Sequence, residues 1–406
     1  MTGDDARPAD PLDLLALDDE LSPGERDTRD RVRALVDEHV RPHVAGWFAD
    51  GVFPRDLVPR LAEAGLLGMH LQGYGCAGRS AVEYGLAMAE LEAGDSGIRT
   101  FVSVQGSLAM SAIAKHGSPA QRERWLPGMA AGETIGCFAL TEPGSGSDPA
   151  SMTTTATRVG DEWVLSGRKR WIGLASIADV AVVWARAVDP AEDGENGEEA
   201  KPRVRGFLVP TSTPGFVATP IEPKLSLRAS VQCDVVLDDV RLPPDAILPL
   251  HPGLAGPFAC LDEARYGIAW GATGAARDCL DAALRRAGER VQFGRPLAAF
   301  QLTQAKLVDM ALEVSRGQLL ALRLGRLKDA GRLEPHMISA GKLANVRGAI
   351  EVARTARTVL GGDGITLEHS PMRHAANLES VRTYEGTDEV HTLILGRHLT
   401  GVQAFR

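Results

Sequence analysis

The sequence lacks the features that mark secreted, membrane-spanning and cysteine-metal proteins. Its five cysteines stand far apart in 406 residues and form no Cys-x-x-Cys pair, which argues against a disulfide framework and against a cysteine-bound metal. No apolar run approaches the about 18 residues of a membrane-spanning helix. The N-terminal stretch is acidic, whereas signal and transit peptides are basic. We therefore expect a cytoplasmic protein from a reducing compartment.

Basic residues are also scarce relative to acidic ones. Lys and Arg number 44 against 53 Asp and Glu, so the formal net charge is −9, and no excess of positive charge is available to attract a nucleic-acid backbone. The sequence contains neither a His-Glu-x-x-His zinc motif nor a Gly-x-Ser-x-Gly nucleophile elbow. We expect no metal site, no nucleic-acid partner and no serine-hydrolase chemistry.

The hydrophobic pattern changes twice along the chain. Residues 1–22 are acidic and lack a period, which predicts a loosely docked N-terminal arm. Residues 23–133 carry apolar residues at intervals of three and four, which predicts a helical domain. Its helices are expected at Glu25 to about Phe48, Leu57–Leu67, Ala81–Ala93 and Leu108–Lys115.

Residues 134–250 are richer in Thr, Val and Trp, and their short runs bounded by turn residues predict a β domain. The acidic stretch Asp189–Ala200 between two of these runs is interpreted as a solvated loop. Residues 251–406 return to helical periodicity, and the order of helices, strands and helices predicts an α+β fold. The C-terminal helices are expected at Phe258–Arg286, Gln301–Ala330, Pro335–Leu360 and Thr387–Leu399.

Three polar motifs and two arginines carry the candidate chemistry. The Gly- and Ser-rich turn Leu140–Pro149 allows close approach of a flat polar ligand, although an ordinary loop is the simpler explanation on local evidence. The glycines in Leu360–Ile365 follow a helix, where they cap its end or contact a phosphate. Glu385 lies in a tight turn, where a carboxylate acts as a general base or is merely solvated. Arg99 and Arg290 are suited to bind a carboxylate or phosphate, with surface ion pairs as the alternative.

Taken in order, these motifs resemble the acyl-CoA dehydrogenase family over nearly the whole chain after the N-terminal arm. The matching segments are Leu140–Asp148, Lys169–Ile172, Glu289–Leu297, Phe300–Leu302, Leu360–Ile365 and Tyr384–Thr387. Other segments resemble the members that act on glutaryl-CoA, namely Leu71–Gly78, Leu91–Arg99, Lys224–Ser230, Ala264–Gly271 and Leu399–Phe405. The resemblance implies an N-terminal helical domain, a middle β domain and a C-terminal four-helix bundle, assembled as a homotetramer with FAD near the subunit interfaces.

The same resemblance implies roles for individual residues. Glu385 is expected to remove the α-proton of an acyl-CoA while hydride passes to flavin N5, and Arg99 is expected to pair with the distal carboxylate of glutaryl-CoA. The other residues expected to bind substrate are Glu92, Thr100, Ser147, Phe258, Leu261, Asp262, Arg265, Tyr384 and Gly386. Those expected to bind FAD, with Arg290 and Gln301 reaching a neighbouring subunit, are Phe138, Leu140, Thr141, Gly146, Ser147, Trp171, Ile172, Gly173, Arg290, Phe293, Gln301, Gly361, Gly362, Thr387 and Glu389.

The leading hypothesis is oxidation and decarboxylation of glutaryl-CoA to crotonyl-CoA and CO2, in lysine or tryptophan breakdown, with electron-transfer flavoprotein as acceptor. One departure bears on the acceptor. Dehydrogenases of the family commonly read Trp-Ile-Thr-Asn where this chain reads Trp171-Ile-Gly-Leu, and similar versions occur in short-chain acyl-CoA oxidases, which use O2. Two alternatives stay open: an enzyme for another short acyl-CoA, and a flavin-free acyl-CoA-binding scaffold on the same fold.

Overall fold

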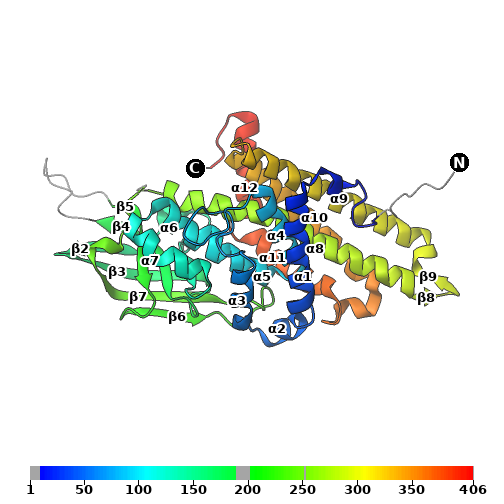
Figure 1. Cartoon of the computed structure of the whole chain (residues 1–406), viewed down its shortest axis with the longest axis horizontal. Coiled ribbons are helices and arrows are strands. Elements are labelled where there is room, and N and C mark those ends of the chain that lie inside the picture. Colours follow the sequence, from blue (N-terminus) through cyan, green and yellow to red (C-terminus); the bar gives the residue numbers. More distant parts are fainter. Residues whose placement is uncertain (1–9, 189–201, 251–252, 406) are drawn as a thin grey trace.

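The computed structural model describes residues 10–188, 202–250 and 253–405. The large sheet lies at one end of the molecule, and the long helices extend toward the other end (Figure 1). None of the described helices combines the length and the apolar composition needed to cross a membrane. Within the same ranges, no three His, Cys, Asp or Glu side chains come together as a metal site.

The N-terminal part consists of short helices, three of which begin at a capping box. They are α1 (Pro23–His39), α2 (Val44–Asp50), α3 (Val58–Glu63), α4 (Ala81–Gly94), α5 (Ser96–Val102), α6 (Ser111–His116) and α7 (Pro119–Ala130). In each box a serine caps the helix and is matched three residues later by Glu or Gln: Ser22 before α1, Ser80 before α4 and Ser118 before α7.

Two of the expected N-terminal helices are wrong in extent. The helix expected from Glu25 to about Phe48 is two helices, because the chain turns between His39 and Val44, where Pro42 has no N–H to continue the ladder. The helix expected over Leu57–Leu67 is confined to α3. The described part of the arm is also docked, since Leu21 is buried and Arg326 donates to the carbonyl of Glu20 at 2.7 Å.

A buried helical segment runs from residue 96 to residue 116 and interrupts its α-helical pattern in the middle. A π-helical stretch, Ser103–Met110, joins α5 to α6, and every residue of α5 is buried. The expected helix at Leu108–Lys115 is therefore only the end of a longer element that also carries Arg99. π-helical turns occur often at functional sites.

The middle part is a seven-stranded sheet in the order β1-β4-β2-β3-β7-β6, with β5 paired to β4. The strands are β1 (Gly136–Ala139), β2 (Thr155–Val159), β3 (Glu162–Gly173), β4 (Val180–Val188), β5 (Arg203–Pro210), β6 (Phe216–Pro220) and β7 (Gln232–Leu242). β1 and β2 pair with β4 in parallel, and the other pairs are antiparallel. The run expected from Glu162 extends to Gly173, with register shifts against β7. The acidic stretch Asp189–Ala200 lies outside the described residues.

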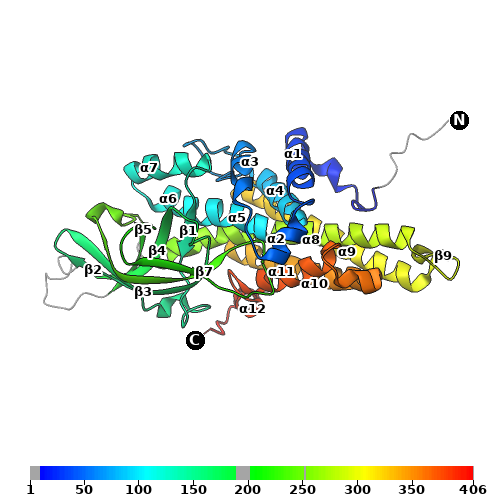
Figure 2. The ribbon, with the colours of Figure 1, turned by 90° about the horizontal axis from the view of Figure 1, so that it is seen from below.

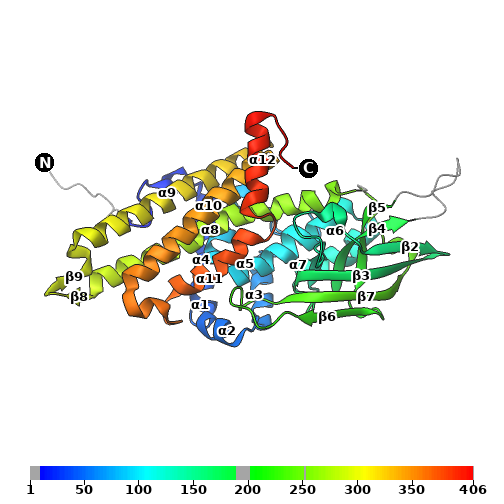
Figure 3. The same cartoon turned by 180° about the vertical axis from the view of Figure 1, so that it is seen from behind.

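The C-terminal part contains four bundled helices and a final helix. They are α8 (Ala255–Glu289), α9 (Gln301–Asp329), α10 (Pro335–Leu360), α11 (Ser370–Thr383) and α12 (Asp388–Thr400), with the short hairpin β8 (Val291–Gln292) and β9 (Arg295–Pro296) between α8 and α9. Figure 2 shows α1, α3, α6 and α7 along one side of the molecule and α10, α11 and α12 along the other. Figure 3 shows α12 crossing α10.

The four helices predicted in this part are confirmed to within a few residues at each end, but α11 was not predicted. Its buried residues include Arg373, His374 and Asn377, so the helix presents no continuous apolar stripe that periodicity would detect. Two of these polar side chains are paired inside the protein, since Arg373 and Asn377 both donate to Asp95.

Glycines on α8 let α4 approach it closely. A Cβ added to Gly274 would lie 1.8 Å from the carbonyl oxygen of Ala89, and one added to Gly271 would lie 2.0 Å from Oε2 of Glu92. Both distances are too short for any side chain. At Gly274 the backbone of α4 therefore packs directly against α8, whereas at Gly271 the side chain of Glu92 fills the space.

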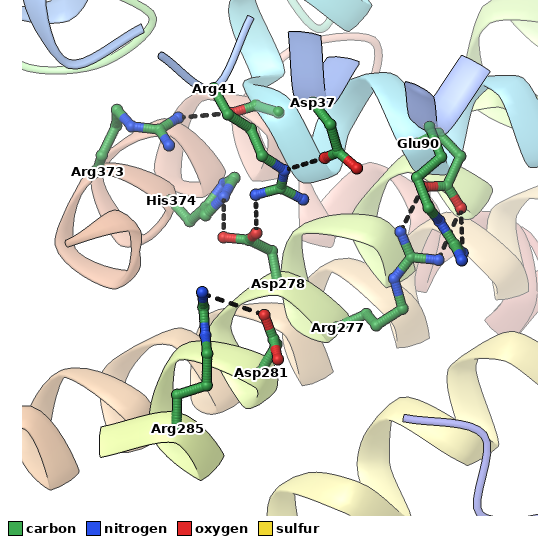
Figure 4. Close-up of polar contacts among 11 residues, drawn as sticks. Asp37, Arg41, Glu90, Arg277, Asp278, Asp281, Arg285, Arg373 and His374 are labelled. Atoms are coloured by element: carbon green, nitrogen blue, oxygen red, sulfur yellow. Dashed lines mark hydrogen bonds and ion pairs between the residues drawn. The ribbon is translucent and has the colours of Figure 1, made fainter. Parts of the chain in front are cut away.

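Buried ion pairs join the same two helices to α1 and α11 (Figure 4). Glu90 of α4 accepts from Arg277 of α8 at 2.6 Å and from Arg33 of α1 at 3.0 Å. Asp278 of α8 accepts from Arg41, and its other oxygen lies 3.2 Å from Nε2 of His374 on α11. Burial alone would raise the pKa of Glu90, but the two arginines outweigh it and lower that pKa to about 2.

We predict that Gly274→Ala destabilises the fold whereas Gly288→Ala, on the same helix, does not. The first change forces α4 and α8 apart and should lower the free energy of unfolding by about 1–3 kcal/mol. Gly288 has no atom within 4 Å of an added Cβ, so the second should leave stability unchanged or raise it by up to about 1 kcal/mol. Denaturant unfolding measures both, and equal losses would contradict the close contact.

We also predict that Glu90 makes the fold acid-sensitive. Its pKa is about 2 when folded against 4.5 for an unperturbed Glu, so its stabilisation is complete above pH 5 and is lost as the pH falls toward 2. The loss between pH 5 and pH 3 should be about 2 kcal/mol. In Glu90→Gln this contribution to the pH slope of unfolding should disappear. Glu162→Gln, at an exposed ion pair with Arg241, serves as the control and should keep the slope.

Candidate active site

Glu385 lies in the turn that joins α11 to α12, in a left-handed backbone conformation. Its φ is +55°, and Gly386 follows with φ +98°. A Cβ on Gly386 would lie 2.8 Å from Nε2 of His391, so both the conformation and the space require glycine there. The turn thus has one residue that must be glycine and one that bears a carboxyl group in a strained conformation.

Two cations hold this turn through its backbone. Nζ of Lys342, on α10, donates to the carbonyl of Tyr384 and, at 2.5 Å, to that of Gly386. Nε of Arg265, on α8, donates to the carbonyl of Glu385 at 2.8 Å. Three successive carbonyl groups therefore accept hydrogen bonds from two helices of the bundle.

The carboxyl group of Glu385 has the environment of a proton acceptor. Its Oε2 is shielded from solvent and has no hydrogen-bond partner among the described residues. Burial raises the pKa of Glu385, and the positive charges of Lys342, Arg99 and Arg265 oppose this rise. A carboxylate with a raised pKa and a free oxygen is suited to general-base catalysis near neutral pH.

Arg99 lies beside this turn, entirely buried within α5. Its Nε donates to Oε2 of Glu92 at 2.6 Å and its Nη2 donates to the hydroxyl of Tyr384, while Oγ1 of Thr100 lies 3.4 Å from the same hydroxyl. Nη1 of Arg99 and Oε1 of Glu92 are buried and have no partner in the described part of the chain. A buried guanidinium with a free N–H group is a binding point for an anion. The structure thus brings together six residues predicted from the sequence: Glu92, Arg99, Thr100, Tyr384, Glu385 and Gly386.

The predicted CoA-contacting residues occupy the first turns of α8. Phe258 is 38% exposed, and Asp262 accepts from Nη1 of Arg265 at 3.2 Å. Leu261 packs partly buried against the core. Arg265 belongs to both groups, because it also reaches the turn at Glu385.

A second cluster of predicted residues lies in the β domain around the Gly- and Ser-rich turn. Nζ of Lys169 donates to the carbonyl of Leu140 at 3.0 Å, and the N–H of Arg170 donates to the carbonyl of Thr141 at 2.9 Å. Trp171 occupies an irregular stretch of β3 with φ +61° and is 53% exposed. Of the other predicted residues here, Phe138, Leu140 and Ile172 are buried, Thr141 and Gly173 are partly buried, and Gly146 and Ser147 are exposed.

A third group lies far from Glu385 in the same chain. Arg290 follows Arg265 by 25 residues along α8, which corresponds to about 37 Å. Phe293 in the β8–β9 hairpin is 94% exposed, and the hairpin is at the opposite end of the molecule from the sheet (Figure 1). Arg290, Gln301, Gly361 and Gly362 are exposed as well. These residues therefore do not belong to the Glu385 cluster within one chain.

The remaining predicted residues begin α12. Thr387 caps the helix by accepting from the N–H of Val390, and Glu389 is exposed. Two lysines that hold the site were not predicted as site residues: Lys342, and Lys169, which is buried and pairs at 2.9 Å with Glu142, a residue within the segment Phe138–Ser147 that was expected to line the flavin. A lysine within the apolar stripe of α10, four residues after Ile338 and four before Val346, was the sequence signal for the first.

Family models of known proteins match the N-terminal, middle and C-terminal parts of the chain separately. The models described as the N-terminal, middle and C-terminal domains of acyl-CoA dehydrogenase match residues 22–133, 137–240 and 253–400. The human mitochondrial short-chain specific acyl-CoA dehydrogenase is 36% identical over 370 residues, covering 90% of this chain and 88% of that protein. The chain belongs to the acyl-CoA dehydrogenase family.

Solved structures of family members superpose over almost the whole chain. A glutaryl-CoA dehydrogenase from Mycobacterium smegmatis is 60% identical, with a TM-score of 0.93 and coverage of 98% of this chain and 99% of that one. A glutaryl-CoA dehydrogenase of the same organism in complex with FADH2 is 55% identical, with the same TM-score and coverage. Butyryl-CoA dehydrogenase from Megasphaera elsdenii is 28% identical, with a TM-score of 0.86 and coverage of 93% and 98%.

Proposed function

We propose that this acyl-CoA dehydrogenase uses FAD to oxidise glutaryl-CoA and then releases CO2, giving crotonyl-CoA. The observation that carries the proposal is the pairing of two unsatisfied groups in one cluster. Oε2 of Glu385 is free to accept a proton, and Nη1 of Arg99 is free to bind a carboxylate. Tyr384, next to Glu385 in the chain, hydrogen-bonds to Arg99, so the two groups belong to one network.

The residues of the β-domain cluster fit a flat, partly polar cofactor. The exposed indole of Trp171 offers an aromatic face, and an added Cβ on Gly144 or Gly146 would meet no atom within 4 Å. Lys169 and Arg170 hold this turn against β3. The relative in complex with FADH2 is 55% identical to this chain, which supports FAD as the group held here.

The exposed group at the β8–β9 end fits a contact with another copy of the chain. Phe293 is almost fully exposed, and Val291 and Leu302, which lie near it in the chain, are exposed as well; a group of exposed apolar side chains is typical of a surface that another molecule covers. We propose that Arg290, Phe293 and Gln301, with Gly361 and Gly362, reach the FAD of a neighbouring subunit in a homotetramer.

Glu385 removes the proton next to the thioester in the proposed mechanism. The carbon acid is weak, so the negative charge that develops on the thioester oxygen must be stabilised by donors already in place. The N–H of Glu385 itself is one such donor. Bound FAD supplies the acceptor for the hydride that leaves the β-carbon.

Arg99 holds the distal carboxylate of glutaryl-CoA through its free Nη1. A carboxylate buried here without a partner would be strongly disfavoured. After oxidation the C–CO2 bond breaks, CO2 departs, and the electron pair is delocalised to the thioester oxygen. The proton held on Glu385 is available to complete crotonyl-CoA.

The acceptor of the electrons is proposed to be electron-transfer flavoprotein. Gly173 stands beside the exposed Trp171, and an added Cβ on Gly173 would lie 3.4 Å from Cγ2 of Val104. That distance is an ordinary van der Waals contact, so the space at Gly173 admits the Cβ of the threonine common in related dehydrogenases. An oxidase that reduces O2 is the alternative, and anaerobic and aerobic turnover without the flavoprotein distinguish the two.

We predict that the purified protein, mixed anaerobically with glutaryl-CoA and an artificial electron acceptor, forms crotonyl-CoA, identified by mass. Glu385→Gln should lower the rate by about 10³- to 10⁴-fold without loss of the flavin absorbance. Release of glutaconyl-CoA would contradict decarboxylation. Oxidation of butyryl-CoA but not glutaryl-CoA would favour a short-chain dehydrogenase instead, and a colourless protein that does not take up FAD would favour a scaffold.

We further predict that Arg99 selects the dicarboxylate. Replacing Arg99 alone leaves buried Glu92 unpaired, so the informative comparison is Arg99→Met with Glu92→Gln against Glu92→Gln alone. The double variant should lower the ratio of kcat/KM for glutaryl-CoA over butyryl-CoA by about 100-fold, the size expected for a lost buried charge pair. An unchanged ratio would place the substrate carboxylate elsewhere.

A further inference from the structure

We infer that Lys342 is a positioning residue for Glu385, holding the carbonyl groups of the residues before and after it so that its carboxylate and its N–H serve the same thioester. The inference rests on the proposed role of Glu385 as the base. The observation that carries it is the pair of hydrogen bonds from Nζ to the carbonyls of Tyr384 and Gly386.

Lys342 is placed where a lysine has no structural reason to be. It is 1% exposed and occupies the apolar stripe of α10 between Ile338 and Val346. A buried ammonium is costly unless its hydrogens are satisfied. Both of its hydrogen-bond acceptors are backbone carbonyls of the turn, so its side chain is committed to the peptides around Glu385.

Peptide planarity converts these bonds into an orientation for the N–H of Glu385. In a trans peptide the carbonyl and the N–H point in opposite directions. The carbonyl of Tyr384 shares its peptide with the N–H of Glu385, so anchoring the carbonyl on Lys342 turns that N–H away from α10. Arg265 fixes the next peptide in the same way, through the carbonyl of Glu385.

The backbone of Glu385 needs such an anchor. With φ at +55°, this residue is in a conformation that residues other than glycine, asparagine and aspartate seldom adopt. Without hydrogen bonds on both neighbouring carbonyls, the turn can relax to negative φ. That change would move the carboxylate away from the α-proton and the N–H away from the thioester oxygen.

The protonation of Glu385 also depends on the charge of Lys342. Four charged side chains act on Glu385: Lys342 of α10, Arg99 of α5, Arg265 of α8 and Glu92 of α4. Lys342 is also close to the charge of Asp388, at the start of α12. Burial raises the pKa of Glu385, and Lys342 is the strongest opposing charge. Removing the ammonium therefore raises the pKa of Glu385. The acid limb of the pH–rate profile, where the rate falls because Glu385 is protonated, then moves to higher pH.

Two variants separate the hydrogen bonds from the charge. Lys342→Met and Lys342→Gln have side chains of nearly equal length and no charge, but the glutamine amide keeps two donor hydrogens for the two carbonyls. The readout is exchange of the α-hydrogens in D2O, followed by mass, in an acyl-CoA with sulfur in place of the β-carbon. Such a substrate analogue cannot lose hydride, so exchange reports proton removal alone.

We expect Lys342→Met to slow exchange by about 100-fold, as misplacement of a catalytic group does, and Lys342→Gln to slow it by about 10-fold or less. Both should move the acid limb upward in pH. Asn345→Ala is the control: Asn345 is buried one turn further along α10 and also donates to two carbonyls, of Ala269 and Gly317, but it does not reach the turn. It should lower thermal stability and leave the pH profile unchanged.

The outcomes are distinct. Exchange by Lys342→Met at the wild-type rate with an unmoved acid limb would overturn the inference, as would equal losses in the Met, Gln and Asn345→Ala variants without a pH shift. Absence of exchange in the wild-type enzyme would instead contradict the proposed base. Should Lys342→Met fail to fold, the pH profile of Lys342→Gln decides, because its neutral side chain must still shift the limb.

Discussion

The contact between α4 and α8 leaves no space for a side chain at Gly271 or Gly274 of α8. Both the joining of the N-terminal helices to the C-terminal bundle and the proposed site depend on this contact. Gly274 lets α8 touch the backbone of α4, and Gly271 leaves the room that Oε2 of Glu92 occupies. Glu92 in turn pairs with Arg99 on α5. The same packing that joins the N-terminal helices to the bundle therefore also positions Arg99, the residue proposed to bind the substrate carboxylate.

Buried polar and charged side chains, together with the buried Leu378 and Val381, hold α11, the helix that leads to Glu385. Asp95, at the end of α4, accepts from Arg373 and Asn377 of α11, and Asn377 accepts from the N–H of Leu227 in the loop before β7. Asp278 of α8 makes a further contact with α11, since its Oδ2 lies 3.2 Å from Nε2 of His374 (Figure 4). Removing one partner of a buried ion pair costs several kcal/mol of stability. These pairs therefore fix the position of α11, and with it the position of the turn at Glu385 that follows the helix.

The sequence predicted the long helices and the order of the three parts because their apolar periodicity is strong. It did not reveal α11 or α5, since one buries polar side chains and the other is buried on every side, and neither arrangement shows a periodic stripe. The motifs predicted Glu385 and Arg99 as site residues, and the structure brings them together, but they did not predict the lysine that holds the turn. Lys342 interrupts the apolar stripe of α10, but its partners are backbone carbonyls, and the sequence does not show which carbonyls it would reach.

The length of α8 gives a physical reason for one expectation that came only from the resemblance. The resemblance assigned Arg290 and Gln301 to the FAD of a neighbouring subunit. α8, with its 35 residues, separates Arg290 from Arg265 by about 37 Å and so places Arg290 at the far end of the bundle from the β domain. A motif match names the residues of a proposed site, whereas the length of the helix shows which of them a single chain can bring together.

The left-handed conformation at Glu385 restricts how this position can change over evolutionary time. Asparagine, aspartate and glycine accept positive φ more readily than other residues, so only aspartate keeps both the backbone conformation and an acidic group. Aspartate, however, is one methylene shorter, which withdraws the carboxylate from whatever glutamate reaches. A lineage that loses this glutamate therefore has no single-residue replacement that preserves both the fold of the turn and the reach of the acid, and a new base must come from another element.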